Sequence, residues 1–228
     1  MRYSRQVILP ELGEEGQKNL LASRILCIGA GGLGCAALPY LAAGGIGKIG
    51  ICDDDRVELS NLQRQVLFTT ADAGKPKAAL AAEKLRALNP DIQVQVHEER
   101  LSPENALRLF AEYDIILDGS DNFATKFLIN DACVKLGKPW VYAAVLGFEG
   151  QVGVFQKNHG PCYRCLYNRP PQNPVANCAE AGVLGAFVGM VGALQAVEVI
   201  KLAAKRPDLP PLYGRLLSFD ARTWQMRE

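Results

Sequence analysis

Residues 24–34 read RILCIGAGGLG, an apolar run that passes into a glycine-rich turn. The run is typical of a buried β-strand, and the helical pattern of residues 33–43 begins inside the turn. A second apolar run, residues 48–53, ends in the carboxylate of Asp53. These segments predict a β-α-β unit whose glycines let the backbone approach a phosphate at the helix N-terminus, with Asp53 accepting ribose hydroxyls. The alternative, that the glycines serve only tight contact between helix and strand, stays open.

Strand and helix patterns alternate along the rest of the chain. In chain order, we expect a helix at 77–88, strands at 92–97 and 114–118, a helix at 123–136, and strands at 140–144, 151–156 and 215–219. Such alternation predicts a parallel sheet covered by helices on both faces. The last two strands are expected to join by a hairpin-like or crossing arrangement. The predicted fold is α/β, a doubly wound Rossmann-like, mostly parallel sheet with an antiparallel C-terminal extension.

Length and composition are those of a soluble globular chain with one core. The chain has 228 residues, of which 49% are hydrophobic and 21% charged. Chains divide into domains beyond about 250–300 residues, so residues 1–228 are expected to form a single domain. Lys and Arg number 25 against 24 Asp and Glu, which provides no field for nucleic acid or an anionic membrane. Seven scattered cysteines and the absence of a signal-peptide pattern indicate a cytoplasmic protein.

Two segments near the C-terminal third need separate interpretation. Residues 181–197 are uncharged, which is the lower edge of membrane-span length. Gln195 and four glycines in this stretch favour a helix buried in the core or in a dimer interface, so no membrane partner is expected. Residues 166–177 are rich in Pro and Asn and are expected to form a mobile surface loop, a candidate lid.

Cationic, amide and carboxylate side chains follow the predicted strand ends. Arg64 in SNLQRQ, residues 60–65, can bind two phosphate oxygens, and Lys77 can neutralise another. Asp121 in DGSDN, residues 118–122, can hold Mg²⁺ against the phosphates. Each side chain alone is more often a solvated surface group, but open parallel sheets bind ligands at this edge. The set predicts a nucleotide with more phosphate charge than a nicotinamide dinucleotide carries.

Short motifs along the whole chain resemble the ThiF/MoeB/HesA family, bacterial relatives of the ubiquitin-activating enzymes, and look closest to ThiF. The motifs are RYSRQ (2–6), GAGGLG (29–34), DDD (53–55), SNLQRQ (60–65), PK (76–77), DGSDN (118–122), CYRC (162–165) and NC (177–178). The resemblance implies an adenylyltransferase that uses ATP and Mg²⁺ to adenylate the C-terminal glycine of a ubiquitin-like sulfur-carrier protein ending in Gly-Gly. Pyrophosphate leaves, and the product is ready for thiocarboxylate formation.

The identity of the carrier is left open by the motifs. A ThiS-type carrier of thiamine thiazole biosynthesis is the first choice, and a MoaD-type carrier of molybdopterin biosynthesis is the second. A sulfurtransferase or cysteine desulfurase is a further implied partner. A rival from another class is an NAD- or FAD-dependent oxidoreductase with the same glycine loop, which would leave Arg64, Lys77 and Asp121 without a task. A non-enzymatic rival is a module that binds the carrier but no longer activates it.

The resemblance also implies individual roles. The catalytic residues are Arg5, Arg64, Lys77, Asp121 and Cys178. Arg5 corresponds to a family arginine that reaches across a homodimer to the triphosphate in the other subunit. The implied nucleotide-binding residues are Gly31, Gly32, Gly34, Asp53, Asp55, Ser60, Asn61, Leu62, Gln63, Arg64, Lys77, Asp121 and Asn122.

Three cysteines have open interpretations. Cys178 precedes a glycine-rich helical segment, and a helix N-terminus there would lower the pKa of its thiol. The resemblance implies that this cysteine forms a covalent bond with the carrier or with sulfur. The alternative is that Cys178 is an inert apolar side chain. Cys162 and Cys165 have the spacing of half a zinc site or of a redox pair. The family closes this zinc site with a second Cys-x-x-Cys near the C-terminus, and none follows Cys178 here, so zinc binding stays open.

The chemistry of the implied reaction agrees with the residue types. An α-carboxyl group has a pKa of about 3.5 and needs no general base at neutral pH. It needs positive charge around it, because an anion must approach a polyanion. The chain has only two histidines, His97 and His159, which fits a reaction without a proton relay.

Overall fold

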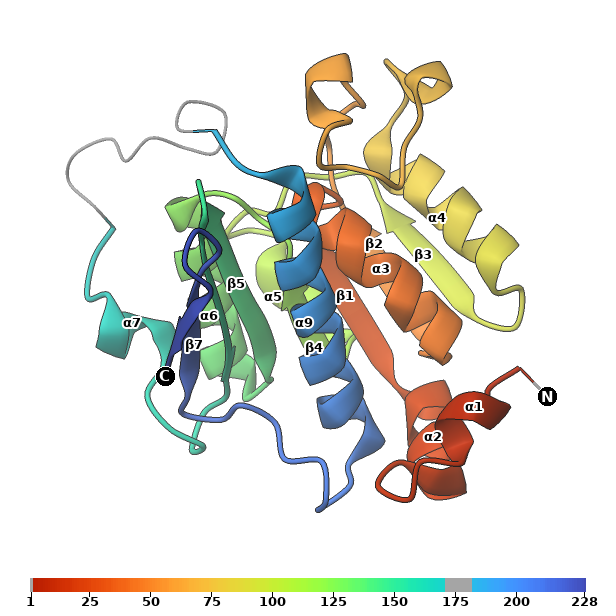
Figure 1. The fold of residues 1–228 in the computed structure, drawn as a ribbon, viewed down its shortest axis with the longest axis vertical. Helices are drawn as coiled ribbons and strands as arrows, with labels where there is room; N and C mark the ends of the chain where they lie inside the picture. Colours follow the sequence, from red (N-terminus) through yellow and green to blue (C-terminus); the bar gives the residue numbers. More distant parts are fainter. Residues whose placement is uncertain (1, 171–181) are drawn as a thin grey trace.

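Eight strands form one mixed sheet in the computed structural model, which describes residues 2–170 and 182–228 (Figure 1). The strand order is β3-β2-β1-β4-β5-β6-β7-β8. The strands are β1 Arg24–Ile28, β2 Lys48–Cys52, β3 Gln93–His97, β4 Ile115–Asp118, β5 Trp140–Leu146, β6 Glu149–Phe155, β7 Leu216–Asp220 and β8 Gln225–Arg227. Pairing is parallel from β3 to β5 and antiparallel from β5 to β8, so the predicted fold class is confirmed.

Helices cover both faces of the sheet. They are α1 Ser4–Val7, α2 Gly13–Ala22, α3 Gly32–Gly44, α4 Lys77–Leu88, α5 Ala106–Ala111, α6 Phe123–Leu136, α7 Tyr163–Leu166 and α9 Gly185–Ala204, with 3-10 turns η1 Leu59–Asn61 and η2 Thr70–Asp72. Side chains alternate along β1: Ile25 and Cys27 join the core under α3, α4 and α9, whereas Leu26 and Ile28 join the core under α5 and α6. Two apolar cores therefore hold the sheet between helical layers.

Helix α9 is a core helix, as its composition predicts, and it begins at Gly185 rather than near residue 181. It is long and apolar enough to cross a membrane, yet it lies against α3 and the sheet (Figure 1). A Cβ on Gly192 would lie 2.6 Å from the carbonyl oxygen of Leu33, so the helices pack at a distance that excludes a side chain. Gln195 is fully buried, and its amide donates to the carbonyls of Asp118 and Val141.

The C-terminal strands connect differently from the simplest expectation. β5 and β6 are each longer than predicted and form a hairpin, with Leu146 paired to Glu149. β6 and β7 are antiparallel neighbours, but the long segment containing α7 and α9 separates them in sequence, so they join by a crossing connection and not by a hairpin. Leu166 closes α7 and does not begin a loop; residues 171–177 of the expected lid lie outside the described residues.

The cysteines in the described ranges are free thiols. Cys27, Cys35, Cys52 and Cys133 are buried in the two cores. Burial raises the pKa of Cys35 and of Cys52 to about 12, and raises the pKa of Cys27 and Cys133 well above the usual value. These four side chains are therefore protonated at neutral pH and behave as apolar core residues.

Candidate functional site

A cavity of about 820 Å³ opens at the carboxyl ends of the parallel strands. One half is lined by the loops that follow β1, β2 and β4. The other half follows the hairpin of β5 and β6, from Tyr142 to Gln151. The site is therefore at the sheet edge where open α/β sheets bind ligands, and it continues onto the antiparallel strands.

The glycine loop gives the cavity an exposed stretch of backbone. Gly29 has a φ of +91°, a conformation that favours glycine. Gly31 and Gly32 line the cavity where α3 begins, and a Cβ on Gly32 would lie 2.7 Å from Cγ1 of Val188. Gly34 does not line the cavity: a Cβ there would lie 2.2 Å from the carbonyl oxygen of Gly29, so this glycine serves close helix–strand contact, and its expected binding role stays a prediction. The free helix N-terminus faces the cavity and suits an anion.

Asp53 and Lys77 lie on the wall formed after β2. The two carboxylate oxygens of Asp53 accept hydrogen bonds from the backbone N–H groups of Ala30 (2.7 Å) and Asp55 (2.8 Å). Burial raises the pKa of Asp53, and these two hydrogen bonds oppose the rise. The carboxylate is thus fixed in place with lone pairs left for hydroxyl donors. Nζ of Lys77, nearly buried, lies 2.9 Å from the exposed carboxylate of Asp55.

The turn after η1 brings only part of the predicted segment into the cavity. Asn61 and Arg64, three residues apart, both line it. Ser60, Leu62 and Gln63 do not: Ser60 donates to Glu58, Leu62 packs against the core, and Gln63 is exposed. Since these three side chains do not line the cavity, their expected binding role stays a prediction.

Gln65 is a cavity residue that the sequence analysis did not single out. Its side chain is buried and lines the cavity. Oε1 of Gln65 is buried without a hydrogen-bond partner in the described structure. A buried amide oxygen in a cavity wall is a group that a ligand donor would satisfy.

The loop after β4 presents Asp121 and Asn122 to the cavity. Asp121 is exposed at the cavity, and no ion pair to it is found within the described residues. Asn122 caps α6: its Oδ1 accepts from the N–H of Thr125 at 2.9 Å. No group of three or more His, Cys, Asp or Glu side chains that could hold a metal ion occurs in the described part of the chain. One free carboxylate still fits Mg²⁺, because proteins commonly hold this ion by one or two carboxylates and the phosphates of the substrate.

Lys126 is a second cavity residue that sequence reasoning missed. Its ammonium group is nearly buried and donates to Oδ2 of Asp118 (2.8 Å) and to the carbonyls of Ser120 (2.9 Å) and Ala143 (2.7 Å). Nζ also lies 5.2 Å from the ring centroid of Tyr142. Lys126 therefore ties the loop that carries Asp121 to strand β5. Its place in a regular helical pattern gave no sign of this contact.

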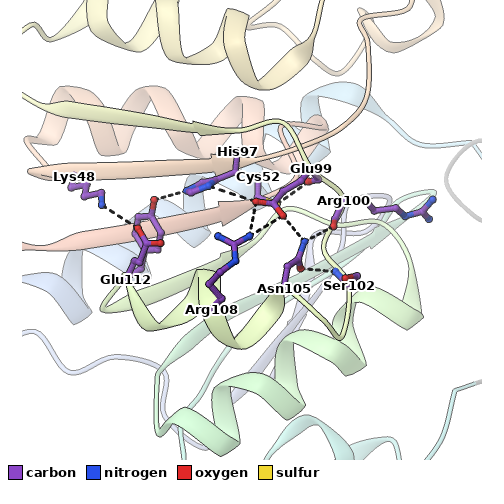
Figure 2. A network of polar contacts seen from close by, with 10 residues as sticks. Lys48, Cys52, His97, Glu99, Arg100, Ser102, Asn105, Arg108 and Glu112 are labelled. Carbon is purple, nitrogen blue, oxygen red and sulfur yellow. Dashed lines mark hydrogen bonds and ion pairs between the residues drawn. The ribbon is translucent and has the colours of Figure 1, made fainter.

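The wall opposite the glycine loop is residues 99–101, held by the polar network that Figure 2 shows. The carboxylate of Glu99 accepts from Arg108 at 3.0 and 3.1 Å and from Nδ2 of Asn105 at 2.7 Å. The hydrogen bond from Arg108 is the main reason that the pKa of Glu99 lies below its usual value. The thiol of Cys52 donates to the carbonyl of Glu99 at 3.1 Å. The network anchors this wall on α5 and β2.

The remaining predicted residues lie away from the cavity or outside the described residues. Arg5 is exposed on α1, which packs near Gly44 at the end of α3 remote from the glycine loop (Figure 1). The sulfur atoms of Cys162 and Cys165 are 3.6 Å apart near the surface, and no third metal ligand accompanies them among the described side chains. Cys178 belongs to the residues that the structure does not describe.

Comparisons with known proteins agree with this geometry. Residues 3–228 match the model of the ThiF family. The chain is 49% identical over 226 residues to the "Sulfur carrier protein adenylyltransferase" of Thermus thermophilus, an alignment that covers 96% of this chain and 83% of that protein. It is 50% identical to the "Adenylyltransferase and sulfurtransferase MOCS3" of Arabidopsis thaliana, covering 99% of this chain but only 48% of that protein. The chain thus spans about half the length of that relative.

A solved structure shares the fold. The structure described as E. coli MccB with ATP superposes with a TM-score of 0.86 at 24% sequence identity, covering 100% of this chain and 70% of that chain. At this identity the likeness concerns the fold alone.

Proposed function

Because this chain belongs to the ThiF family, we propose that it adenylates the C-terminal carboxylate of a sulfur-carrier protein with ATP. The observation that carries the proposal is the continuous cavity, which joins a phosphate-binding half to a channel along β5 and β6. One half suits a nucleotide, and the other can receive an extended peptide end. Adenylation requires both ligands at once.

One orientation of the nucleotide brings its phosphates, ribose and base to different walls of the cavity. The phosphates lie at the N-terminus of α3, with Arg64 and Lys77 beside them, and the ribose hydroxyls reach Asp53. The base then extends toward residues 99–101 on the opposite wall. The carrier terminus enters along the β5–β6 hairpin, past Gly150, and ends near the loop that carries Asp121.

The reaction needs positioning and charge rather than acid–base catalysis. The carrier carboxylate attacks the α-phosphorus of ATP, a new carboxylate–phosphate bond forms, and the α–β phosphoanhydride bond breaks with release of pyrophosphate. Arg64 and Lys77 stabilise the charge that builds on the phosphates. Lys77 is already paired with Asp55, so the phosphates must either share the ammonium group of Lys77 with that carboxylate or displace the carboxylate. Mg²⁺ held by Asp121 would supply further charge neutralisation.

The subunit arrangement and the cysteines extend the proposal. Arg5 lies too far from its own cavity to act there, so we place it in the site of a second subunit of a homodimer. Cys178 remains the candidate for sulfur transfer, with a sulfurtransferase or cysteine desulfurase as donor partner. Zinc binding stays an open expectation: a structural zinc site needs four ligands, and Cys162 and Cys165 supply two in the described residues.

The sequence motifs do not distinguish a ThiS-type carrier from a MoaD-type carrier. Neither relative described above has a name that mentions thiamine, so a ThiS-type carrier loses its first place, and MOCS3-like similarity favours a MoaD-type carrier. Both carriers belong in the test.

The first prediction concerns ATP–pyrophosphate exchange. The protein should exchange labelled pyrophosphate into ATP only with Mg²⁺ and a carrier that has its Gly-Gly terminus, because the terminal carboxylate is the nucleophile. Deleting that terminus should abolish exchange, and mass spectrometry should detect carrier plus AMP. Exchange that continues without the terminus would contradict the mechanism.

The oxidoreductase rival is tested by titration calorimetry. Arg64, Lys77 and Asp121 line one cavity, and a dinucleotide gives these side chains no combined task. The protein should therefore bind ATP with Mg²⁺ more tightly than NADH. Tight NADH binding with indifference to ATP would favour the rival.

A further inference from the structure

The wall formed by residues 99–101 presents an unusual stretch of backbone to the cavity. Leu101 lines the cavity, and neither its N–H nor its carbonyl has a hydrogen-bond partner within the described residues. An N–H beside a C=O complements the edge of adenine, which offers N1 as acceptor and the N6 amino group as donor. Guanine offers the reverse pattern, O6 as acceptor and N1–H as donor. A fixed backbone edge at Leu101 can therefore distinguish the two bases.

Asn105 holds the residues on both sides of this edge, as Figure 2 shows. Its Nδ2 donates to the carboxylate of Glu99 at 2.7 Å and to the carbonyl of Arg100 at 2.9 Å. Its Oδ1 accepts from the N–H of Ser102 at 2.8 Å. One side chain thus fixes three groups that flank Leu101, and it does not itself line the cavity.

We propose that Asn105 is a positioning residue that fixes the backbone of Leu101 for recognition of the base and so sets the preference for adenine over guanine. This inference rests on the proposed use of ATP. Selectivity based on hydrogen bonds depends on fixed donors and acceptors, because a mobile edge can rotate to suit the wrong base. Residues 99–102 have no regular secondary structure of their own, so side-chain contacts must supply that rigidity.

The rest of the network supports a positioning role. Arg108 holds the second oxygen of Glu99, and the thiol of Cys52 holds its carbonyl. Neither Arg108 nor Asn105 lines the cavity, so the side chains that hold the Glu99 carboxylate do so from outside it. Asn105 is the member of the network that reaches past Glu99 to Arg100 and Ser102.

The experiment compares Asn105→Ala with a matched control, Asn19→Ala. Asn19 also donates a side-chain hydrogen bond to backbone, at 2.8 Å to the carbonyl of Ala204, but it is remote from the cavity. Calorimetry with Mg²⁺-ATP and Mg²⁺-GTP measures both dissociation constants without any carrier. Exchange kinetics then give kcat and KM for ATP, and thermal melting reports the stability of each variant.

For Asn105→Ala, we expect the ATP dissociation constant to rise about tenfold, the scale of one base-edge contact, with that for GTP changed less than about twofold. The kcat at saturating ATP should stay within about twofold, because the phosphate-binding groups are untouched. Asn19→Ala should lower the melting temperature yet keep the ATP-to-GTP ratio of the wild type.

Asn105→Asp keeps the shape and the acceptor for Ser102 but loses both donated hydrogen bonds. Like Asn105→Ala, it should raise the ATP dissociation constant more than that for GTP. It therefore tests the proposal if Asn105→Ala does not fold. An unchanged ATP-to-GTP ratio in a folded Asn105 variant would overturn the positioning role. A wild type that binds GTP as tightly as ATP would instead contradict the proposed function.

Discussion

Lys126 shows how one buried charge can tie two walls of a cavity together. A buried ammonium is tolerated only when it is fully paired, and Lys126 has a carboxylate, two carbonyls and an aromatic ring around it. Its partners come from the loop after β4 and from strand β5. The loop after β4 and strand β5, which both line the cavity, are therefore joined through this one group.

Replacing Lys126 by Met should destabilise the fold. Asp118 is fully buried and would lose its cationic partner, so the free energy of unfolding should fall by about 3–5 kcal/mol. The double variant Asp118→Asn with Lys126→Met removes both charges and should recover much of the loss. Urea denaturation measures both; a Lys126→Met variant as stable as wild type would show that the ion pair contributes nothing.

The sequence predicts the residues that follow strand ends, and it misses those defined by tertiary contacts. Asp53, Arg64 and Asp121 lie in the cavity because the segments that follow parallel strands gather at one edge of the sheet. Lys126 was missed because position 126 looks like any other in a helix. Asn105 was missed because its partners, residues 99–102, follow no periodic pattern.

Helix α9 shows at the element scale how glycine spacing sets the distance between helices. Gly192 faces α3, where a Cβ would meet the carbonyl of Leu33 and, at 2.8 Å, Cβ of Ala36. Gly189 lies one turn earlier, and a Cβ at that position would have no neighbouring atom within 4 Å. The two glycines share a helix, but only one of them is required by contact.

Alanine at these two positions should therefore have opposite effects. Gly192→Ala should cost about 1–3 kcal/mol through overpacking against backbone that cannot move aside. Gly189→Ala should stabilise by about 0.5–1 kcal/mol, because it lowers the entropy of the unfolded helix segment. Guanidinium denaturation gives both values; equal effects of the two substitutions would contradict the close α3–α9 contact.

Elements with clear end signals were predicted to the residue, and short ones were not. Helices α4 and α6 have the predicted bounds, since Pro76 and Asn122 precede them and Asn89 and Gly137 follow them. Helices α1, α2 and α5 and strand β8 were not predicted. α1, α5 and β8 are too short to show a hydrophobic periodicity. α2 is mostly polar, and its few apolar residues form only a weak apolar face.

At the scale of the whole molecule, one residue with a predicted catalytic role, Arg5, lies away from the cavity of its own chain. Arg5 lies on α1 beside the end of α3 opposite the cavity. Large apolar side chains are exposed at Ile8 and Leu9, which follow α1, at Tyr40 on α3 and at Val197 on α9. A single sequence does not specify how two copies meet, so this part of the site stays a prediction.

A mixed dimer tests the placement of Arg5. Arg5→Ala and Asp121→Ala should each inactivate the homodimer. In a dimer of one subunit of each kind, one site regains both residues, so random mixing should restore about one quarter of wild-type exchange activity. Coexpression with two affinity tags isolates the mixed species. If the purified mixed dimer is inactive, Arg5 does not act across the subunits.

The four core thiols have a practical consequence for an enzyme proposed to handle sulfur. With their pKa raised by burial, Cys27, Cys35, Cys52 and Cys133 carry almost no thiolate at neutral pH. They are poor traps for electrophilic sulfur and poor targets for maleimide. Labelling of the native protein would therefore start from a low background, and a persulfide or thioester formed at the surface would stand out against it.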